Sequence, residues 1–497
     1  MNYVRHCNYR RAGVQGQRRW CWVPVAPEPT KATDFKRVQS GRPGAAAAAS
    51  RVGTRCPPAA SHAVYLDSPW VLRLNEREER RMSDINRFLW GASTAPMQIE
   101  GNNLNSDWWR REAASPGMEP SGDACDSYHR YPEDIALLAE SGLDTYRFGI
   151  EWSRIEPRPG QVSRAELAHY RRMIDTCLHA GVTPVVTVHH FSNPLWFADE
   201  GGWMGSNAVD RFTFFAETVA PILGDVPYLI TMNEPNMLAQ MMTIEQMMRE
   251  GTFNAWQSPT VARDGDEEPV LNVSGLPAPT REHSERLIEA HRAARDVLSA
   301  RTDARVGWSV ANQVFEAVEG GEERLRYERE AREDVFLEAA RSDDFLGVQA
   351  YSAQSVGPQG PIAHQPAEGN TLVGTPFRPD ALGLALRHAW DVARVPLLVT
   401  ENGIATGDDD RRIQYTAEAL RGLFAAARDG VELLGYLHWT LLDNWEWGHW
   451  GPTFGLIGVD RVTFERSPKP SLEWLGRVAR SQGALVDAGL ATADQQR

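Results

Sequence analysis

The chain has 497 residues, of which 42% are hydrophobic and 24% charged, which is enough apolar material for a large buried core. Chain length alone is compatible with two or three domains, although α/β barrels routinely exceed about 250 residues as one domain. The formal net charge of −14 excludes a broadly basic surface for nucleic acid or anionic lipid. Apolar runs stay shorter than the roughly 20 residues that a membrane-spanning helix needs.

The first 82 residues differ in composition from the rest of the chain. They hold 15 Lys and Arg against 6 Asp and Glu, with a run of alanines at Ala45–Ala49. This composition predicts a disordered N-terminal extension over residues 1–82. The extension lacks the apolar core of a secretory signal, but it faintly resembles a transit peptide, which remains an alternative. Expression from Met82 tests whether the extension is needed.

The cysteines are few and lack metal-binding or redox spacing. With no CxxC pair, neither a zinc knuckle nor a redox motif is indicated. Only two cysteines lie in the expected folded region, which favours a reducing, cytoplasmic location over a disulfide-stapled secreted protein. The five cysteines are Cys7, Cys21, Cys56, Cys125 and Cys177.

From Phe88 onward, short β-rich apolar runs alternate with amphipathic helical stretches. Eight near-continuous apolar strands separated by helices predict parallel strands that are buried on both faces. Eight such units close into a single (β/α)8 TIM barrel, which we expect over residues 83–480, with a C-terminal tail over residues 481–497. The expected strands are Phe88–Ala92, Thr145–Ile150, Thr183–His190, Tyr228–Asn233, Arg305–Ala311, Asp344–Ala350, Pro396–Glu401 and Leu433–Trp439.

Helical periodicity marks the stretches between these strands, and two long connections interrupt the alternation. The clearest amphipathic stretches are Tyr131–Glu140, Arg164–Ala180, Ala208–Ala220, His283–Ala300 and Thr416–Asp429. The segments from Met241 to Ala278 and from Ser352 to Pro379 read as long loops. Loops of this length are usually functional or disordered, and both follow strands, on the barrel face where active sites lie.

Polar side chains gather where the expected strands end. Charged groups deep inside a closed barrel are costly to desolvate, so this convergence at the mouth indicates a site. Singly, two of them have plain structural interpretations: Arg147 can neutralise a buried carboxylate, and His189 can be a core histidine. The strand-end residues are Arg147, His189, His190, Asn233, Glu234, Gln349, Tyr351, Glu401, Asn402, His438 and Trp439.

Two glutamates carry the chemical prediction. Glu234 and Glu401 end the fourth and seventh strands, which face each other across the mouth of an eight-stranded barrel. Glycosidic bond cleavage needs one carboxyl to protonate the leaving oxygen and another to act at the anomeric carbon. A separation of about 5–5.5 Å gives retention of configuration, whereas about 6.5–9.5 Å gives inversion. The spacing is not readable from the sequence.

From about Phe88 to Trp474 the chain resembles glycoside hydrolase family 1, the β-glucosidase family. Seven segments occur in the family's order and at similar spacing, although the two glutamate motifs also occur singly in related barrel glycosidases. The resemblance implies one (β/α)8 barrel, a retaining mechanism and no cofactor or metal. The segments are Phe88–Gly101, Cys125–Ile135, Tyr146–Pro157, Thr187–Pro194, Thr231–Pro235, Thr400–Gly403 and His438–Trp447.

The resemblance also implies roles for individual residues. Glu234 matches the acid/base, Glu401 the nucleophile, and Asn233 the group that bonds the sugar 2-hydroxyl. Trp439 matches the aromatic floor under the sugar, and Arg147 and Tyr351 match groups that flank the nucleophile. The residues that match contacts to the 3-, 4- and 6-hydroxyl groups are Gln98, His190, Glu446 and Trp447.

Because Glu446 would repel a phosphate, a free hydroxymethyl group is expected on the sugar.

Several positions depart from the family pattern. Gln349 stands where the family usually has Asn, which alters a supporting amide, and the loop after Asn236 lacks a Gly-rich segment. The leaving-group preference is therefore open. The other departures are Phe191, Pro96–Met97 and Gly149.

The expected protein is thus an exo-β-glycosidase that acts on a small β-glycoside or oligosaccharide and binds neither nucleic acid nor membrane. Three alternatives remain: a transglycosidase with the same covalent intermediate, a non-catalytic sugar-binding relative, and an inverting hydrolase. The preferred sugar configuration, the natural aglycone and the oligomeric state are not determined by the sequence.

Overall fold

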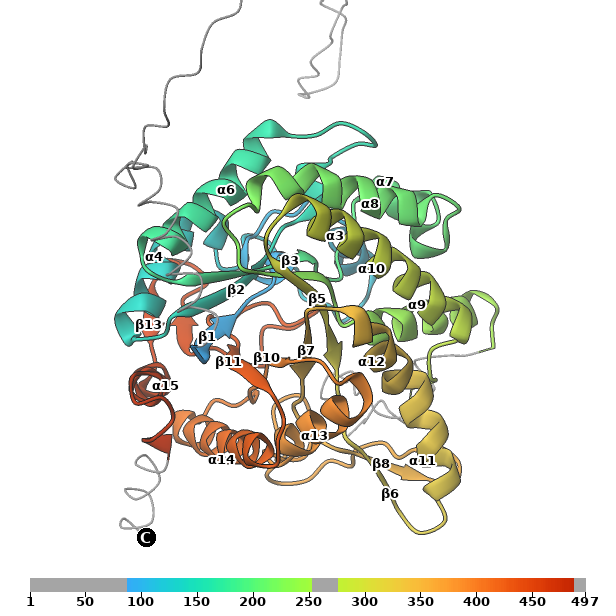
Figure 1. The fold of residues 1–497 in the computed structure, drawn as a ribbon. Coiled ribbons are helices and arrows are strands. Elements are labelled where there is room, and N and C mark those ends of the chain that lie inside the picture. The colour runs from blue at the N-terminus through green and yellow to red at the C-terminus, as the bar shows by residue number, and fades with distance from the viewer. Residues whose placement is uncertain (1–86, 253–275, 487–497) are drawn as a thin grey trace, which may run out of the picture. The chain divides into compact units, whose positions relative to one another are not determined.

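The computed structural model describes residues 87–252 and 276–486, which fold around a closed parallel barrel (Figure 1). The strands follow one another round the barrel in the order β1-β11-β10-β7-β5-β4-β3-β2. Their bounds are β1 Leu89–Ser93, β2 Thr145–Gly149, β3 Thr183–His189, β4 Tyr228–Asn233, β5 Arg305–Ala311, β7 Phe345–Gln349, β10 Leu397–Glu401 and β11 Leu433–Trp439. The predicted TIM barrel is confirmed.

The barrel strands form where the sequence predicts them because their side chains are buried inside and outside the sheet. The rings of Trp90 and Tyr146, for example, are completely buried between the sheet and its covering helices. Both faces of a parallel sheet therefore select apolar residues, which gives each strand an almost unbroken apolar run. Strands β4, β5 and β11 have the predicted bounds, and the other five agree to within one residue at each end.

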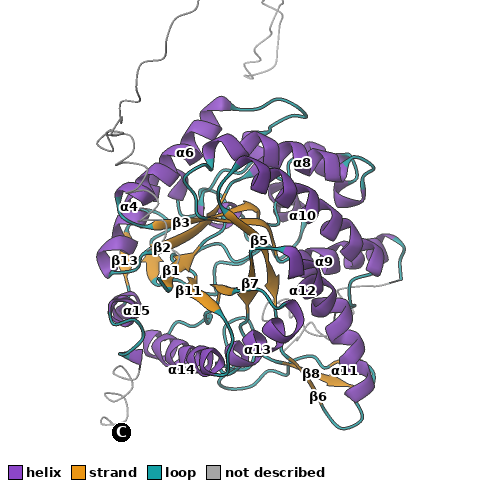
Figure 2. Ribbon diagram, viewed as in Figure 1, coloured by secondary structure: helices purple, strands orange, loops and turns teal. Residues whose placement is uncertain are grey.

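Helices surround the barrel as an outer ring (Figure 2). Their first residues are set by caps: Ser163, Thr280 and Asp408 each accept a hydrogen bond from the backbone of the first turn. The ring consists of α4 Ser127–Ser141, α6 Arg164–His179, α8 Ala208–Val219, α10 Arg281–Arg301, α12 Val335–Ala339, α13 Ala381–Ala393, α14 Asp409–Arg428 and α15 Pro470–Arg480.

The two long connections are more ordered than the sequence predicts. Instead of a loop from Met241, helix α9 runs over Pro235–Arg249, because the Met-rich segment consists of unbranched residues that favour a helix. The rest of that predicted loop falls largely on residues 253–275, which lie outside the described residues.

The second connection contains two short strands, β8 Gln354–Gly357 and β9 Gly360–Pro361. With β6, Phe315–Ala317, they form a three-stranded sheet beside the barrel (Figure 1). Strands of two to four residues leave too short a pattern to detect among glycines and prolines.

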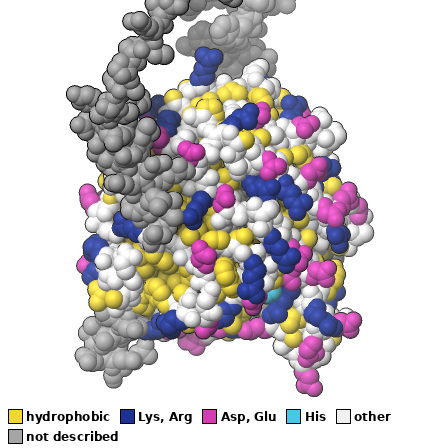
Figure 3. Space-filling view, in the orientation of Figure 1, with side chains coloured by type: hydrophobic (Ala, Val, Ile, Leu, Met, Phe, Trp, Pro, Cys, Tyr) yellow, Lys and Arg dark blue, Asp and Glu magenta, His cyan; other side chains and the backbone are white. Residues whose placement is uncertain are grey.

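Acidic and basic side chains are interspersed on the face shown in Figure 3. Within the described part of the chain, no helix has the length and apolarity needed to span a bilayer. At the C-terminal end, packing continues past α15, because Val486 is buried in the main core cluster. The predicted disordered segment over residues 1–82 lies outside the described residues.

Candidate active site

The structure has a large cavity at the mouth of the barrel, where the strands end. It has a volume of about 520 Å³, within the range of small-molecule sites. Eight of the ten predicted site residues line it, and the other two, Gln98 and Arg147, lie directly behind residues that do. The eight are His190, Asn233, Glu234, Tyr351, Glu401, Trp439, Glu446 and Trp447.

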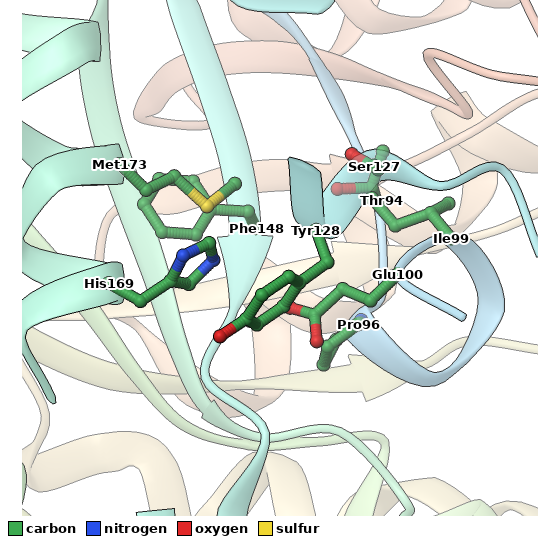
Figure 4. A pocket seen from close by; sticks show the side chains of 10 residues that line it. Thr94, Pro96, Ile99, Glu100, Ser127, Tyr128, Phe148, His169 and Met173 are labelled. Carbon is green, nitrogen blue, oxygen red and sulfur yellow. The ribbon is translucent and has the colours of Figure 1, made fainter. Parts of the chain in front are cut away.

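A second cavity lies outside the barrel wall, between the short helix α2, Pro96–Ile99, strand β2 and the helices α4 and α6 (Figure 4). Its volume of about 10 Å³ is close to that of a single water probe, too small for a substrate. The ring of Tyr128 stacks on His169 beside it, with a centroid distance of 3.9 Å. We therefore regard it as a packing feature.

Glu401 ends β10 and is held by two donors. Arg147, which is completely buried in β2, donates from Nη1 to Oε1 at 2.5 Å, and the Tyr351 hydroxyl donates to Oε2 at 2.7 Å. Burial raises the pKa of Glu401, while the Arg147 cation and the Tyr351 hydroxyl lower it by favouring the charged form. These donors orient both carboxylate oxygens and favour ionisation of Glu401 before Glu234.

Glu234 follows β4 and has a strained backbone. Its φ of 45° lies in the left-handed region, and Pro235 begins helix α9 immediately after it. A left-handed non-glycine residue costs about 1–2 kcal/mol, and such strain recurs at functional sites. The Glu234 amide donates to Ser309 O at 2.8 Å, which ties the turn to β5. The turn brings Glu234 to the cavity wall.

The environment of Glu234 favours its protonated form. Burial is the main reason that its pKa lies well above the ordinary value, and the negative charge of Glu401 adds to the rise. The Arg147 cation acts in the opposite direction. Two carboxyl groups whose environments favour different protonation states are suited to acid and nucleophile roles.

Asn233 is the centre of a buried hydrogen-bond network. Its Oδ1 accepts from Arg147 Nη2, from Ser309 Oγ at 3.1 Å and from Gln349 Nε2 at 2.8 Å. Its Nδ2 lies 3.2 Å from Nε2 of His190. Gln349, which departs from the family pattern, therefore still supplies an amide donor to Asn233.

The predicted sugar-contacting side chains lie together on one side of the cavity. Gln98 Nε2 donates to Glu446 Oε2 at 3.1 Å and to Asn444 Oδ1 at 3.0 Å. Burial, followed by the charge of Glu401, raises the pKa of Glu446 to about 8. The rings of Trp439 and Trp447 lie nearly parallel to that of His190, at interplanar angles of 20° and 17°.

Two histidines from the strand ends are not part of the cavity lining. His189 Nε2 lies 3.0 Å from Asn193 Oδ1, and its ring packs against Trp203. His438 lies 3.3 Å from the Tyr436 hydroxyl. Both side chains are buried, as expected for core histidines.

Some supporting residues were not singled out from the sequence. Ser309 bonds Asn233, Thr187 Oγ1 accepts from Arg147 Nε at 3.0 Å, and Asn444 bonds Gln98. The available signal was a polar residue in an apolar strand, since β5 reads RVGWSVA and β3 reads TPVVTVH. That signal is weak because serine and threonine are common in buried strands.

Two departures from the family pattern compensate for each other. A Cβ atom on Gly149 would lie 2.7 Å from Cδ of Pro96, closer than carbon atoms pack. The proline side chain occupies the space that a serine at position 149 would need, so the two substitutions belong together.

A closed barrel with two buried glutamates in a cavity at its mouth, together with polar and aromatic side chains, defines the class of barrel glycosidases. The family model for glycosyl hydrolase family 1 matches residues 83–262 and 379–484. Thermostable beta-glucosidase B of Thermobispora bispora is 32% identical over 439 residues, covering 80% of this chain and 90% of that protein.

Solved structures of beta-glycosidases are also similar to this chain. The crystal structure of beta-glycosidase BGL167 is 42% identical, with a TM-score of 0.69 over 80% of this chain and 96% of that one. A beta-glucosidase from Thermotoga maritima in complex with glucoimidazole is 26% identical, with a TM-score of 0.68 over 80% and 99% of the two chains. The chain belongs to glycosyl hydrolase family 1 and is a glycosyl hydrolase.

Proposed function

We propose that the protein is a retaining exo-β-glycosidase of the β-glucosidase type, with Glu401 as nucleophile and Glu234 as acid/base. One observation carries this proposal: two buried carboxyl groups line a single cavity, and only Glu401 has a cation and a hydroxyl as direct hydrogen-bond donors. These donors favour the charged form of Glu401, whereas burial and the charge of Glu401 raise the pKa of Glu234.

In the first step, a carboxylate oxygen of Glu401 attacks the anomeric carbon and the bond to the leaving oxygen breaks. The proton of Glu234 passes to that oxygen, and the aglycone leaves as an alcohol. Formation of the ester removes the charge of Glu401, which lowers the pKa of Glu234 and lets it act as a base. Water then attacks the same carbon, gives its proton to Glu234 and releases Glu401.

Asn233 accelerates the reaction if it bonds the sugar 2-hydroxyl more strongly as positive charge develops at the neighbouring carbon. Its Oδ1 already accepts from Arg147, Ser309 and Gln349, so the network fixes the amide plane before substrate binds. Such preorganisation avoids reorientation during the reaction.

We propose that the sugar part of the substrate is an unphosphorylated β-glucosyl group or a close epimer of it. In this proposal the sugar ring stacks on Trp439, and Glu446, Gln98 and His190 offer hydrogen bonds to its hydroxyl groups. A related Thermotoga maritima enzyme is described as a beta-glucosidase and is solved with glucoimidazole, which supports a gluco-configured sugar here. Hydrolysis is favoured over transglycosylation, and product analysis with an added alcohol measures the balance.

Glu401→Gly tests the nucleophile. We expect a folded variant that loses nearly all hydrolysis and regains turnover with azide, which enters the space of the carboxylate and yields an α-glycosyl azide. An azide product of β configuration would contradict the retaining mechanism. Unchanged hydrolysis by Glu401→Gly would remove this residue from the reaction.

Glu234→Ala tests the acid. Loss of general acid catalysis costs roughly 10²–10⁴-fold, but only where the leaving group needs protonation. The kcat/KM value for an alkyl glucoside should therefore fall much further than that for a dinitrophenyl glucoside. Equal losses for the two substrates would contradict the assignment.

A cytoplasmic location is also part of the proposal. Cys125 and Cys177 are free and buried, which is compatible with a reducing compartment. Fractionation of the source cells, with detection of the protein by antibody, would test it.

A further inference from the structure

Asn402 directly follows the proposed nucleophile, and the proposed function gives it no role. Its side chain is completely buried and is not among those that line the cavity, so it does not touch a substrate there. A buried side-chain amide is costly unless it is hydrogen-bonded, and a fully bonded one makes the structure around it rigid. The partners of Asn402 therefore show which groups it holds in place.

The side chain of Asn402 connects the end of β10 to the end of β7. Its Nδ2 donates to Ala350 O at 2.6 Å, and the Ala350 amide donates to Glu401 O at 3.4 Å. Ala350 is the residue immediately before Tyr351. The segment that carries the Tyr351 hydroxyl is thus fastened to the residue that follows Glu401.

Tyr415, in helix α14, fastens the same segment from the helix ring. It is buried, and its hydroxyl donates to the main-chain oxygen of Tyr351 at 2.6 Å. The same hydroxyl accepts from Asn402 Nδ2 at 3.3 Å. Burial raises the pKa of Tyr415, so the hydroxyl stays protonated and remains a donor over the pH range of an assay.

Asn402 is in turn held by β11. The Tyr436 hydroxyl donates to its Oδ1 at 3.0 Å, and the Trp439 amide donates to its main-chain oxygen at 3.0 Å. A flipped amide would place Oδ1 against Ala350 O, so these bonds leave the side chain one orientation. Asn402, Tyr415 and Tyr436 together form a clamp on the main chain at Tyr351.

The clamp bears on the reaction through the Tyr351 hydroxyl. This hydroxyl donates to Glu401 Oε2 at 2.7 Å, and a hydrogen bond weakens when its donor is displaced. The Tyr351 ring is only partly buried and meets the ring of Phe454 edge-on, with a centroid distance of 5.9 Å. Since packing covers only part of the ring, the main-chain bonds of the clamp contribute to its position.

Titratable groups from four parts of the barrel face Glu401. Two of them donate hydrogen bonds to it, and the other two are carboxyl groups whose charges interact with it. Among these four, the clamp bonds directly to the main chain of Tyr351. The four groups are Arg147 on β2, Glu234 after β4, Tyr351 after β7 and Glu446 after β11.

We infer that Asn402 and Tyr415 are positioning residues, which hold the Tyr351 hydroxyl against Glu401 and thereby favour the ionised nucleophile. Neither residue touches the substrate, and both act through Tyr351. The inference rests on the proposed function, because it takes Glu401 as the nucleophile.

The test is the pH profile of kcat/KM for a dinitrophenyl β-glucoside, whose leaving group departs without protonation by Glu234. Tyr415→Phe removes one hydroxyl and keeps the ring. The Tyr351 hydroxyl should then bond Glu401 less well, which raises the pKa of a carboxyl that must be ionised to attack. The acid limb should move to higher pH by roughly 0.3–1 unit, a part of the shift of about one to two units that complete loss of a hydrogen bond to a charged group implies.

Tyr146→Phe is the matched control. Tyr146 is completely buried in β2, and its hydroxyl lies 2.9 Å from Thr94 Oγ1. This variant also loses one buried hydrogen bond, but one that does not involve Tyr351. Urea unfolding should show that both variants are folded, and only Tyr415→Phe should move the acid limb.

Two further variants test the route and the second residue. In a Tyr351→Phe background, which lacks the hydroxyl, Tyr415→Phe should cause no additional shift of the acid limb. Asn402→Ala removes the bond to Ala350 O and should move the limb in the same direction as Tyr415→Phe. The smaller change in Tyr415→Phe keeps the test decisive if Asn402→Ala does not fold.

The outcomes separate this inference from the proposed function. The inference would be overturned by an acid limb that stays in place in Tyr415→Phe or that moves equally in Tyr146→Phe. A shift as large in the Tyr351→Phe background as in the wild type would also overturn it, because the effect would not pass through the Tyr351 hydroxyl. Each of these results leaves a retaining glycosidase, whereas unchanged hydrolysis by Glu401→Gly would overturn the proposed function.

Discussion

At the scale of single residues, the site places two glutamate carboxyl groups in different environments. Burial raises the pKa of both Glu234 and Glu401, but Glu401 also accepts hydrogen bonds from Arg147 and Tyr351, whereas the charge of Glu401 adds to the rise at Glu234. A difference in protonation between two carboxyl groups follows from such surroundings without a metal.

The Tyr351 hydroxyl should therefore control the acid limb of the pH profile. It donates to ionised Glu401, which lowers the pKa of that carboxyl, so Tyr351→Phe should raise it. Because Glu401 must be ionised to attack, the acid limb of kcat/KM should move to higher pH. A hydrogen bond to a charged group suggests a loss of roughly ten- to a hundred-fold at the optimum.

The measurement is a pH profile of kcat/KM for an aryl glucoside, with Tyr327→Phe as control because Tyr327 is 50% exposed and lies in α11, Glu322–Arg329. An acid limb that stays in place, or moves to lower pH, would show that Tyr351 does not stabilise the ionised nucleophile.

At the scale of elements, neighbouring strands and helices constrain each other's residues. Pro96 is the first residue of α2, Pro96–Ile99, and Gly149 is the last residue of β2. A side chain on Gly149 would overlap with the Pro96 ring. The glycine at position 149 is therefore explained by its contact with Pro96.

Gly149→Ser should reduce the free energy of unfolding by about 1–3 kcal/mol, the usual cost of overpacking. Combining it with Pro96→Ser should recover much of that loss. Urea unfolding of the two single variants and the double variant measures the coupling. Gly224→Ser is the matched control, because nothing lies within 4 Å of a Cβ there. If the changes in the free energy of unfolding of the two single variants simply add in the double variant, the two positions do not compensate for each other.

At the scale of the whole molecule, the chain buries several carboxyl groups at a cost in stability. Burial raises the pKa of Glu100 to about 7 and that of Glu446 to about 8. In the unfolded chain these groups titrate near the ordinary glutamate value, so between the two pKa values the folded state holds more protons. Their stabilising contribution is complete below the unfolded pKa and is lost as pH rises through the folded one.

The contribution of these two carboxyl groups to the free energy of unfolding should consequently decrease from about pH 5 to about pH 8. Glu446→Gln, which keeps the shape of the side chain, should make this decrease shallower. Glu473→Gln on α15 is the control, since that carboxyl is 76% exposed. Denaturant unfolding at several pH values measures the slopes. A slope that Glu446→Gln leaves unaffected would show that burial of this carboxyl does not cause the decrease.

The amino-acid sequence by itself determined the barrel and the composition of its mouth. Burial on both faces imposes an apolar pattern on each strand, and functional groups follow where that pattern stops, as at Asn233–Glu234 and Glu401. Both signals are local along the chain. Their recurrence eight times is what made the closed architecture predictable.

Only the tertiary structure decided which groups meet. Gln349 reaches Asn233, and Pro96 fills the space beside Gly149. Each of these contacts joins residues from different elements. Side-chain direction and partner identity arise from packing between distant segments, which no periodicity within one segment records.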